Sequence, residues 1–135
     1  MPTKTFPGLF GSLAAISKFV TGQARQAGLN DDAVYHVELA VDEASSNIIE
    51  HAYGGENKGE ITCVCDIEAD GLTITLRDHG QAFDPTLVPA PDLTSNPEAR
   101  KKGGLGLFII HKVMDEVDFH FSEEGNQIIM VKYKA

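Results

Sequence analysis

The chain has 135 residues, enough for a single domain (residues 1–135) that buries a hydrophobic core without disulfide bonds. Its formal net charge of −9 argues against direct binding to nucleic acid, because affinity for phosphate backbones requires clustered Lys and Arg side chains. The N-terminus has no charged segment followed by an apolar one, and no apolar run could span a bilayer, so we expect a cytoplasmic protein without membrane contact.

The N-terminal part predicts a short strand and two helices. An extended segment around Lys4–Phe6 precedes apolar residues at helical spacing, and this first helix should end near Gly28. A second helix is expected from about Asp32 to Tyr53, with Asn30 or Asp31 as its cap. Its apolar stripe consists of Val34, Val37, Val41, Ala44 and Ile48.

Further along the chain, the period of the apolar residues changes to two, which is typical of strands. One hairpin is predicted with its turn at Ala69–Gly71, and a second with its turn at Glu123–Asn126. The residues expected on the apolar side of the first hairpin are Ile61, Cys63, Cys65, Ile67, Leu72, Ile74 and Leu76. Those of the second are Val117, Phe119, Phe121, Ile129, Val131 and Tyr133. The spacing of Cys63 and Cys65 fits two small buried side chains better than a zinc or redox pair.

Two different segments separate the hairpins. Residues His79–Gly103 contain four prolines and almost no periodicity, which is typical of functional lids or disordered segments. Leu105–Met114 then predicts a short helix that is apolar nearly all round and therefore well buried. Together the elements predict an α+β fold: a two-layer α/β sandwich, with helices on one face of a mainly antiparallel, mixed sheet.

Three short segments contain residues suited to nucleotide chemistry, and the first lies in the second helix. Glu43 and Asn47 are four residues apart and share a helix face, which His36 extends. The Asn47 amide oxygen could bind Mg²⁺, and the Glu43 carboxylate could accept a proton from an attacking hydroxyl group. A solvated polar face explains the same residues. A metal site formed by His36, His51 and Glu43 is a further alternative, although no cysteine or third histidine falls at ligand spacing.

The second segment, Arg77–Asp84, directly follows a predicted strand. The carboxylate of Asp78 could accept a hydrogen bond from an exocyclic amine such as that of adenine. Gly80 would let the backbone approach a flat ring closely. An ordinary turn at the end of a strand uses the same residue types.

The third segment, Gly103–Phe108, leads into the buried helix. Free backbone N–H groups at a helix start form an anion site, and Arg100, Lys101 and Lys102 immediately before it are the chain's tight basic cluster. A flexible hinge with solvated charges is the alternative. The segment is not a P-loop, because no Gly-Lys-Ser/Thr follows, and it lacks the third glycine of a dinucleotide fingerprint.

In this order, the three segments resemble the nucleotide-binding boxes of the anti-sigma factor serine kinases. That family belongs to the ATPase superfamily of gyrase, sensor histidine kinases and mismatch-repair ATPases. Glu38–Tyr53 resembles the N-box, Asp78–Asp84 the first glycine box and Gly104–Ile110 the second. The likeness extends from about Phe6 to the C-terminus and implies the histidine-kinase-like (Bergerat) ATPase fold.

The resemblance also implies roles for individual residues. Glu43 matches the general base, Asn47 the Mg²⁺ ligand and Asp78 the carboxylate that recognises adenine. The other implied contacts to ATP are Gly80, Ala82, Arg100, Gly104, Leu105 and Gly106. Ala82 departs from the family pattern, in which many relatives have a second glycine, and Arg100 falls where the family places a basic lid residue.

The implied activity is transfer of the terminal phosphate of Mg-ATP to a serine of an anti-anti-sigma partner. A sigma factor as second partner and a homodimer remain open. The alternative function is an ATP-binding regulatory module of the same superfamily that acts by protein binding, without kinase activity. A detached sensor-kinase domain is disfavoured because the first helix contains no histidine. An interaction domain without nucleotide binding is disfavoured by the complete set of box residues.

Overall fold

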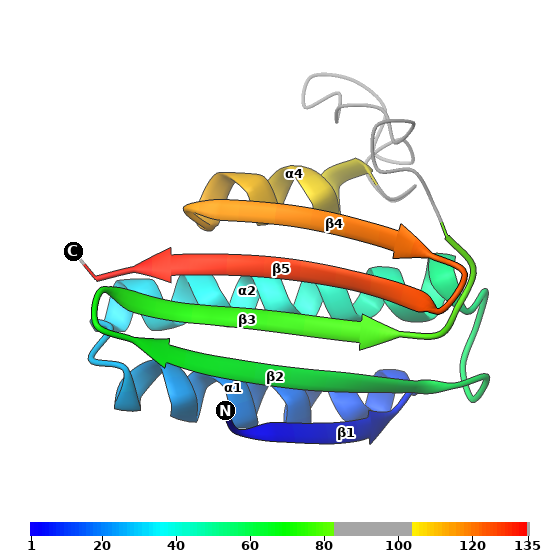
Figure 1. The fold of residues 1–135 in the computed structure, drawn as a ribbon, viewed down its shortest axis with the longest axis horizontal. Coiled ribbons are helices and arrows are strands. Elements are labelled where there is room, and N and C mark those ends of the chain that lie inside the picture. The colour runs from blue at the N-terminus through cyan, green and yellow to red at the C-terminus, as the bar shows by residue number, and fades with distance from the viewer. Residues whose placement is uncertain (83–103, 135) are drawn as a thin grey trace.

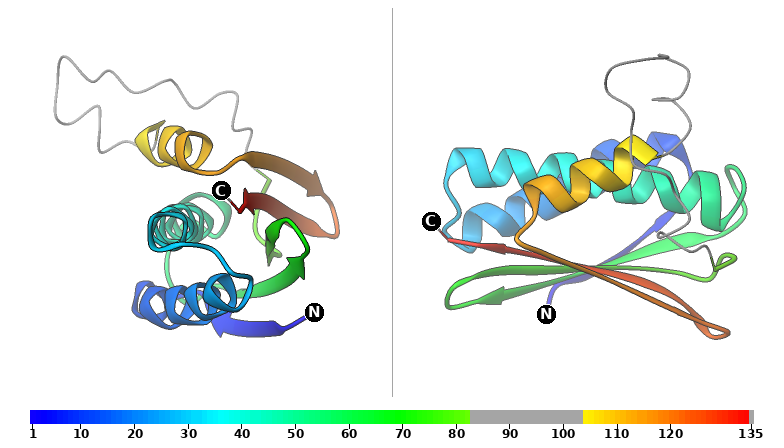
Figure 2. Two further views of the ribbon diagram at one scale, coloured as in Figure 1. Left: turned by 90° about the vertical axis from the view of Figure 1, so that its left-hand side faces the viewer. Right: turned by 90° about the horizontal axis from the view of Figure 1, so that it is seen from above.

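The structure, a computed structural model, describes residues 1–82 and 104–134, without the side chains of residues 104–107. A five-stranded sheet forms one layer, and the helices cover one of its faces (Figures 1 and 2). The strand order is β1-β2-β3-β5-β4. This confirms the predicted two-layer α+β fold. The expected mixed sheet is wrong for the described strands, because every pairing between them is antiparallel.

The elements follow the predicted order. The strands are β1 (Thr3–Pro7), β2 (Glu60–Glu68), β3 (Gly71–Asp78), β4 (Glu116–Ser122) and β5 (Gly125–Tyr133). The helices are α1 (Leu13–Gln26), α2 (Asp31–Asn47) and α4 (Gly104–Val113). A 3₁₀ turn, η1 (Phe10–Ser12), precedes α1, and a π-helical segment, η2 (Ile48–Ala52), continues directly from α2.

The helix ends have identifiable causes. The backbone at Gly28 has a φ of 86°, a left-handed conformation that favours glycine and terminates α1. The side chain of Asn30 then accepts a hydrogen bond from the Ala33 backbone N–H at 2.8 Å and caps the start of α2. The second helix extends nearly as far as predicted, but its last turn widens into η2.

The core lies between the helices and the inner face of the sheet. Both cysteines, Cys63 and Cys65, are fully buried there as free thiols, as expected. Ile67, near the turn that ends β2, is instead 40 % exposed. In α4, Ile110 is fully buried but Phe108 is 38 % exposed, so the helix is less enclosed than predicted.

The second strand of the C-terminal hairpin has the opposite phase to the predicted one. Ile128 and Met130 are buried against the helices, whereas Ile129 and Val131 are only partly buried. Four consecutive apolar residues do not reveal which alternate pair faces the core. The observed phase also turns Asn126 inward, where it is 1 % exposed.

Most of the proline-containing segment, residues 83–103, lies outside the described residues. Within the described part of the chain, no helix combines the length and apolar character needed to cross a membrane.

Two glycine substitutions test this packing in opposite directions. Gly71→Ala should lower the free energy of unfolding by about 1–3 kcal/mol, because its Cβ would lie 2.2 Å from the Lys132 carbonyl oxygen. Gly22→Ala, inside α1 with open space around it, should raise that free energy by about 0.5–1 kcal/mol. Urea unfolding of both variants measures the two effects, and equal effects of the same sign would contradict the described packing.

Candidate functional site

The three predicted segments meet at one end of the molecule. The C-terminal end of α2 with η2, the end of β3 and the start of α4 lie at the same end in the ribbon views (Figures 1 and 2). The α2 helix also packs directly against α4. Residues from distant parts of the sequence are therefore gathered on the helix-covered side of the sheet.

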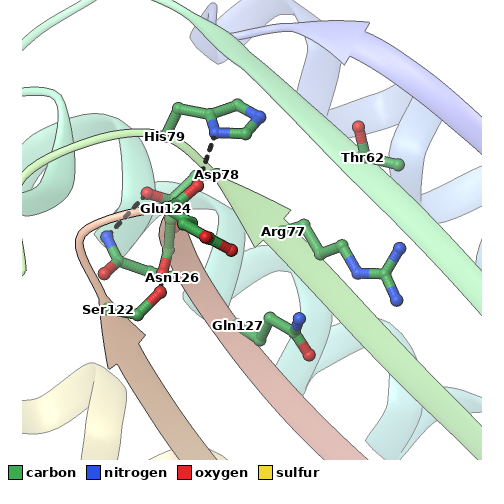
Figure 3. A pocket seen from close by; sticks show the side chains of 9 residues that line it. Thr62, Arg77, Asp78, His79, Ser122, Glu124, Asn126 and Gln127 are labelled. Carbon is green, nitrogen blue, oxygen red and sulfur yellow. Dashed lines mark hydrogen bonds between the residues drawn. The ribbon is translucent and has the colours of Figure 1, made fainter.

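Asp78 is the buried acidic residue of this region, with an exposure of only 2 %. Its Oδ1 atom accepts a hydrogen bond from the Gly80 backbone N–H at 2.8 Å. It accepts a second one from the Asn126 amide at 2.9 Å (Figure 3). Its Oδ2 atom is buried without a hydrogen-bond partner among the described residues. A buried, unpaired carboxylate oxygen is costly in free energy, so this atom is suited to a ligand that donates a hydrogen bond.

The electrostatic environment of Asp78 reflects this arrangement. Burial raises the pKa of its carboxyl group above the ordinary value, and the hydrogen bonds from Asn126 and Gly80 and the nearby His79 partly oppose that rise. The charged form is thus held in place by directed donors but incompletely solvated. A donor on a ligand would complete that solvation.

Asn126, at the start of β5, is a site residue that the sequence analysis missed. Its Nδ2 atom lies close to three acceptors: Asp78 Oδ1 at 2.9 Å, the Gly80 carbonyl at 3.2 Å and the Gln81 carbonyl at 3.3 Å. These acceptors determine the orientation of the amide and leave its Oδ1 buried without a partner in the part of the chain that the structure describes. Asn126 was assigned to a turn, and only the phase of β5 could have revealed that it faces inward.

The residues that follow β3 pack against the end of η2 and form a hydrogen bond with it. A Cβ atom at Gly80 would lie 2.5 Å from the Ala52 carbonyl oxygen, so this position requires glycine. The same carbonyl accepts a hydrogen bond from the Gln81 backbone N–H at 2.7 Å. Ala82, the next predicted contact, is exposed and outside any helix or strand.

Asn47 is the last residue of α2, five residues before Ala52 at the end of η2. It is only 5 % exposed, so a solvated helix face does not describe it. Its Nδ2 atom is buried without a partner in the described part of the chain. Glu43, one turn earlier, is half-buried, and burial together with the charge of Glu50 raises the pKa of its carboxyl group.

His36 does not join these residues. It lies near the start of α2, where it lines a separate cavity of about 290 Å³ together with Asp115 and Lys132. Among the residues that the structure describes, no group of three potential metal ligands comes together. The alternative of a metal site at His36, His51 and Glu43 is therefore unsupported.

The predicted phosphate-binding segment is described in part. Helix α4 begins at Gly104, and Gly104, Leu105 and Gly106 form its first turn, whose backbone N–H groups have no partners within the helix. This first turn contains no acidic residue. Arg100 lies outside the described residues.

A cavity of about 410 Å³ lies on the outer side of the sheet at the same end. Its lining comprises Thr62, Arg77, Asp78, His79, Ser122, Glu124, Gly125, Asn126 and Gln127 (Figure 3). Arg77 pairs with Gln127 across β3 and β5, and their chain neighbours Leu76 and Ile128 are buried. Arg77 and Gln127 therefore point away from the helices, and this cavity is distinct from the region that Glu43 and Asn47 border.

Comparison with known proteins identifies relatives over most of the chain. A family model described as "Histidine kinase-like ATPase domain" matches residues 6–132. The serine-protein kinase RsbW of Listeria monocytogenes serovar 1/2a is 36% identical over 118 residues, covering 84% of this chain and 74% of the relative. The serine-protein kinase RsbW of Bacillus cereus (strain B4264) is 34% identical over 125 residues, covering 90% and 77%.

Solved structures show a similar fold. The crystal structure of the RsbU and RsbW domains of a Mycobacterium tuberculosis protein matches with a TM-score of 0.67 at 14% identity, over 98% of this chain and 32% of that one. The catalytic domain of the histidine kinase ThkA matches with a TM-score of 0.58 at 17% identity, over 99% of both chains.

Asp78→Asn should leave the unliganded protein at least as stable as the wild type at neutral pH. Because the pKa of Asp78 is raised on folding, its carboxyl group stabilises the fold only while protonated, and this contribution is lost as the pH rises through the raised value. Asparagine can keep both hydrogen bonds to Oδ1 without a buried charge.

Urea unfolding at about pH 4 and about pH 7.5 measures this effect. The free energy of unfolding of the variant minus that of the wild type should be larger at the higher pH than at the lower pH. A variant that is less stable than the wild type by more than about 1 kcal/mol at neutral pH would contradict the description of Asp78 as a group strained by burial.

Proposed function

The chain belongs to the histidine kinase-like ATPase domain family, and from that premise we propose that it is an ATP-dependent protein-serine kinase that acts as an anti-sigma factor. One observation carries the proposal. A buried aspartate whose Oδ2 atom has no partner among the described residues lies at the same end of the fold as a buried asparagine whose Nδ2 atom likewise has none there, in a chain 36% identical to a serine-protein kinase.

Asp78 would recognise the adenine base. The 6-amino group of adenine is a hydrogen-bond donor, and the Oδ2 atom of Asp78 lacks one. The two hydrogen bonds to Oδ1 hold the carboxylate in a defined orientation before any ligand arrives. Guanine carries an oxygen at the same ring position, so two acceptors would face each other and GTP would bind less well.

The start of α4 would bind the phosphates. The unpaired backbone N–H groups of a helix start attract anions, and Gly104 and Gly106 have no side chains that would obstruct a phosphate. Arg100, close before this turn in the sequence, would add a positive charge. This placement puts the phosphates near the end of α2, because α2 and α4 are packed together.

Asn47 and Glu43 would complete the reaction centre. The Asn47 side chain is buried, and its Nδ2 atom has no hydrogen-bond partner among the described residues, so no hydrogen bond from Nδ2 fixes the amide and its oxygen can be turned towards a metal. When bound, Mg²⁺ would neutralise charge on the phosphates, with the Asn47 amide oxygen holding it. Glu43 would act as general base, and the raised pKa of its carboxyl group makes it a better proton acceptor than an exposed glutamate.

The reaction would be a phosphoryl transfer to a partner protein. The serine hydroxyl oxygen forms a bond to the terminal phosphorus of ATP, while the bond from that phosphorus to the bridging oxygen breaks and ADP leaves with the electron pair. Glu43 takes the serine proton. An anti-anti-sigma protein with an accessible serine would be the substrate, and a sigma factor the regulated partner.

Incubation with labelled ATP, Mg²⁺ and the anti-anti-sigma protein encoded nearest to this chain's gene tests the proposal. Label should appear on a serine of the partner, and Asp78→Asn should abolish both ATP binding and transfer. Binding of ATP without transfer of label would instead favour the regulatory module without kinase activity.

Glu43→Gln should separate catalysis from binding. Loss of the general base should reduce the rate of phosphoryl transfer by between about 100-fold and about 10,000-fold while the Kd for ATP stays near the wild-type value. Glu38→Gln, an exposed carboxylate on the same helix, is the matched control. A Glu43→Gln enzyme with normal turnover would remove Glu43 from the reaction.

Glu50→Gln should shift the pH dependence of that reaction. The negative charge of Glu50 raises the pKa of Glu43, so its removal should lower that pKa and keep the base deprotonated to lower pH. The acidic limb of the pH–rate profile should therefore move to lower pH. Movement to higher pH would contradict the assigned interaction.

A further inference from the structure

Tyr53, the first residue after η2, joins the helix to the sheet. Its ring lies against Gly59, where an added Cβ atom would come within 2.4 Å of the ring. Its hydroxyl group donates a hydrogen bond to the Glu60 carbonyl at 2.5 Å and accepts one from the His79 backbone N–H at 3.0 Å. The phenol therefore connects the first residue of β2 with the residue that directly follows β3.

These two backbone groups would otherwise face each other between β2 and β3. The antiparallel register pairs Thr62 with Arg77, so two further residues on each strand would place Glu60 opposite His79. The described ladder ends at Thr62 and Arg77. The hydroxyl group thus stands between the strands immediately after Asp78 and takes the place of a direct backbone contact.

The same helix end supports the next residues of the chain. Gly80 packs against the Ala52 carbonyl, and the Gln81 N–H donates to that carbonyl. Ala52 and Tyr53 are consecutive, so one short segment at the end of η2 holds His79, Gly80 and Gln81. Because η2 continues directly from α2, a continuous helical backbone connects that segment with Asn47 and Glu43.

We propose that Tyr53 is a positioning residue that sets the separation between Asp78 and the Glu43–Asn47 end of the helix. This inference rests on the proposed function, because one ATP molecule must reach both groups at once. Without the hydroxyl group, the Glu60 carbonyl and the His79 N–H lose their partner and can pair directly. The end of β3 would then move towards β2 and away from η2, and Asp78 with it.

Tyr53→Phe tests this role, with Tyr35→Phe as the control. Tyr35 is 61% exposed on α2, so loss of its hydroxyl group should change nothing. Tyr53→Phe should weaken ATP binding by about tenfold, because that is roughly the effect of losing one hydrogen bond to a charged group. It should also reduce the preference for ATP over ITP, whose base has an oxygen in place of the 6-amino group.

The preference for ATP over ITP separates positioning from a purely structural role. A general loss of stability would weaken the binding of ATP and of ITP equally and leave the ratio of their affinities unchanged. An unchanged ratio would overturn the proposal. Gly59→Ala provides a second route, because it displaces the Tyr53 ring without removing the hydroxyl group. Whichever variant has wild-type far-UV circular dichroism should show the reduced ratio.

The outcomes also distinguish the inference from the function on which it rests. If the wild type and Tyr35→Phe do not bind ATP, the proposed function fails, and the positioning role fails with it. If both bind ATP and a folded Tyr53→Phe retains their affinity and their preference over ITP, the positioning role alone is overturned.

Discussion

The proposed nucleotide site of this protein depends on one buried carboxylate, of which one oxygen is fixed by hydrogen bonds and the other is not. Asp78 is fixed through Oδ1 by Asn126 and by the Gly80 backbone, while Oδ2 lacks a partner among the described residues. Proteins rarely leave a buried charged oxygen unpaired, since the cost is comparable to that of a lost hydrogen bond. Such a group is better explained by a ligand than by folding, and the proposed recognition of adenine follows from it.

The remaining features place other groups at a defined distance from this carboxylate. The end of η2 contacts the residues after Asp78 through the Ala52 carbonyl and the Tyr53 hydroxyl group. The same helix carries Asn47 and Glu43, and α4 packs beside it with its first turn at the same end. The end of β3 could thus hold the base of a nucleotide while α2 and the start of α4 hold its phosphates, and the contacts of η2 connect the two parts.

Local patterns in the sequence predicted the elements well. The apolar stripe of α2 and the alternation in β3 each indicate a single buried face, and the structure confirms both. The alternation in β2 holds only in part, because Ile67 is exposed and Val64, on the opposite side of the strand from the two cysteines, is also buried. The phase of β5 was wrong because Ile128 to Val131 are all apolar, and only the pairing with β3 distinguishes their two faces. Asn126 was missed for the same reason.

The site was less accessible to sequence reasoning than the fold. Asp78, Asn47 and the glycines could be chosen from their chemistry and from the family resemblance. The burial of these residues could not be predicted, because Asn47 has the same helical spacing as a solvated polar residue. Contacts such as that of Tyr53 with His79 join residues 26 positions apart and depend on the widened last turn of the helix, which no local pattern indicates.

A crystal structure of the protein with Mg²⁺ and a non-hydrolysable ATP analogue tests the central claim most directly. The account predicts the 6-amino group of adenine within hydrogen-bond distance of Asp78 Oδ2, with the phosphates between the start of α4 and Asn47. A nucleotide bound in the outer cavity beside Arg77, with Oδ2 of Asp78 still unpaired, would contradict it.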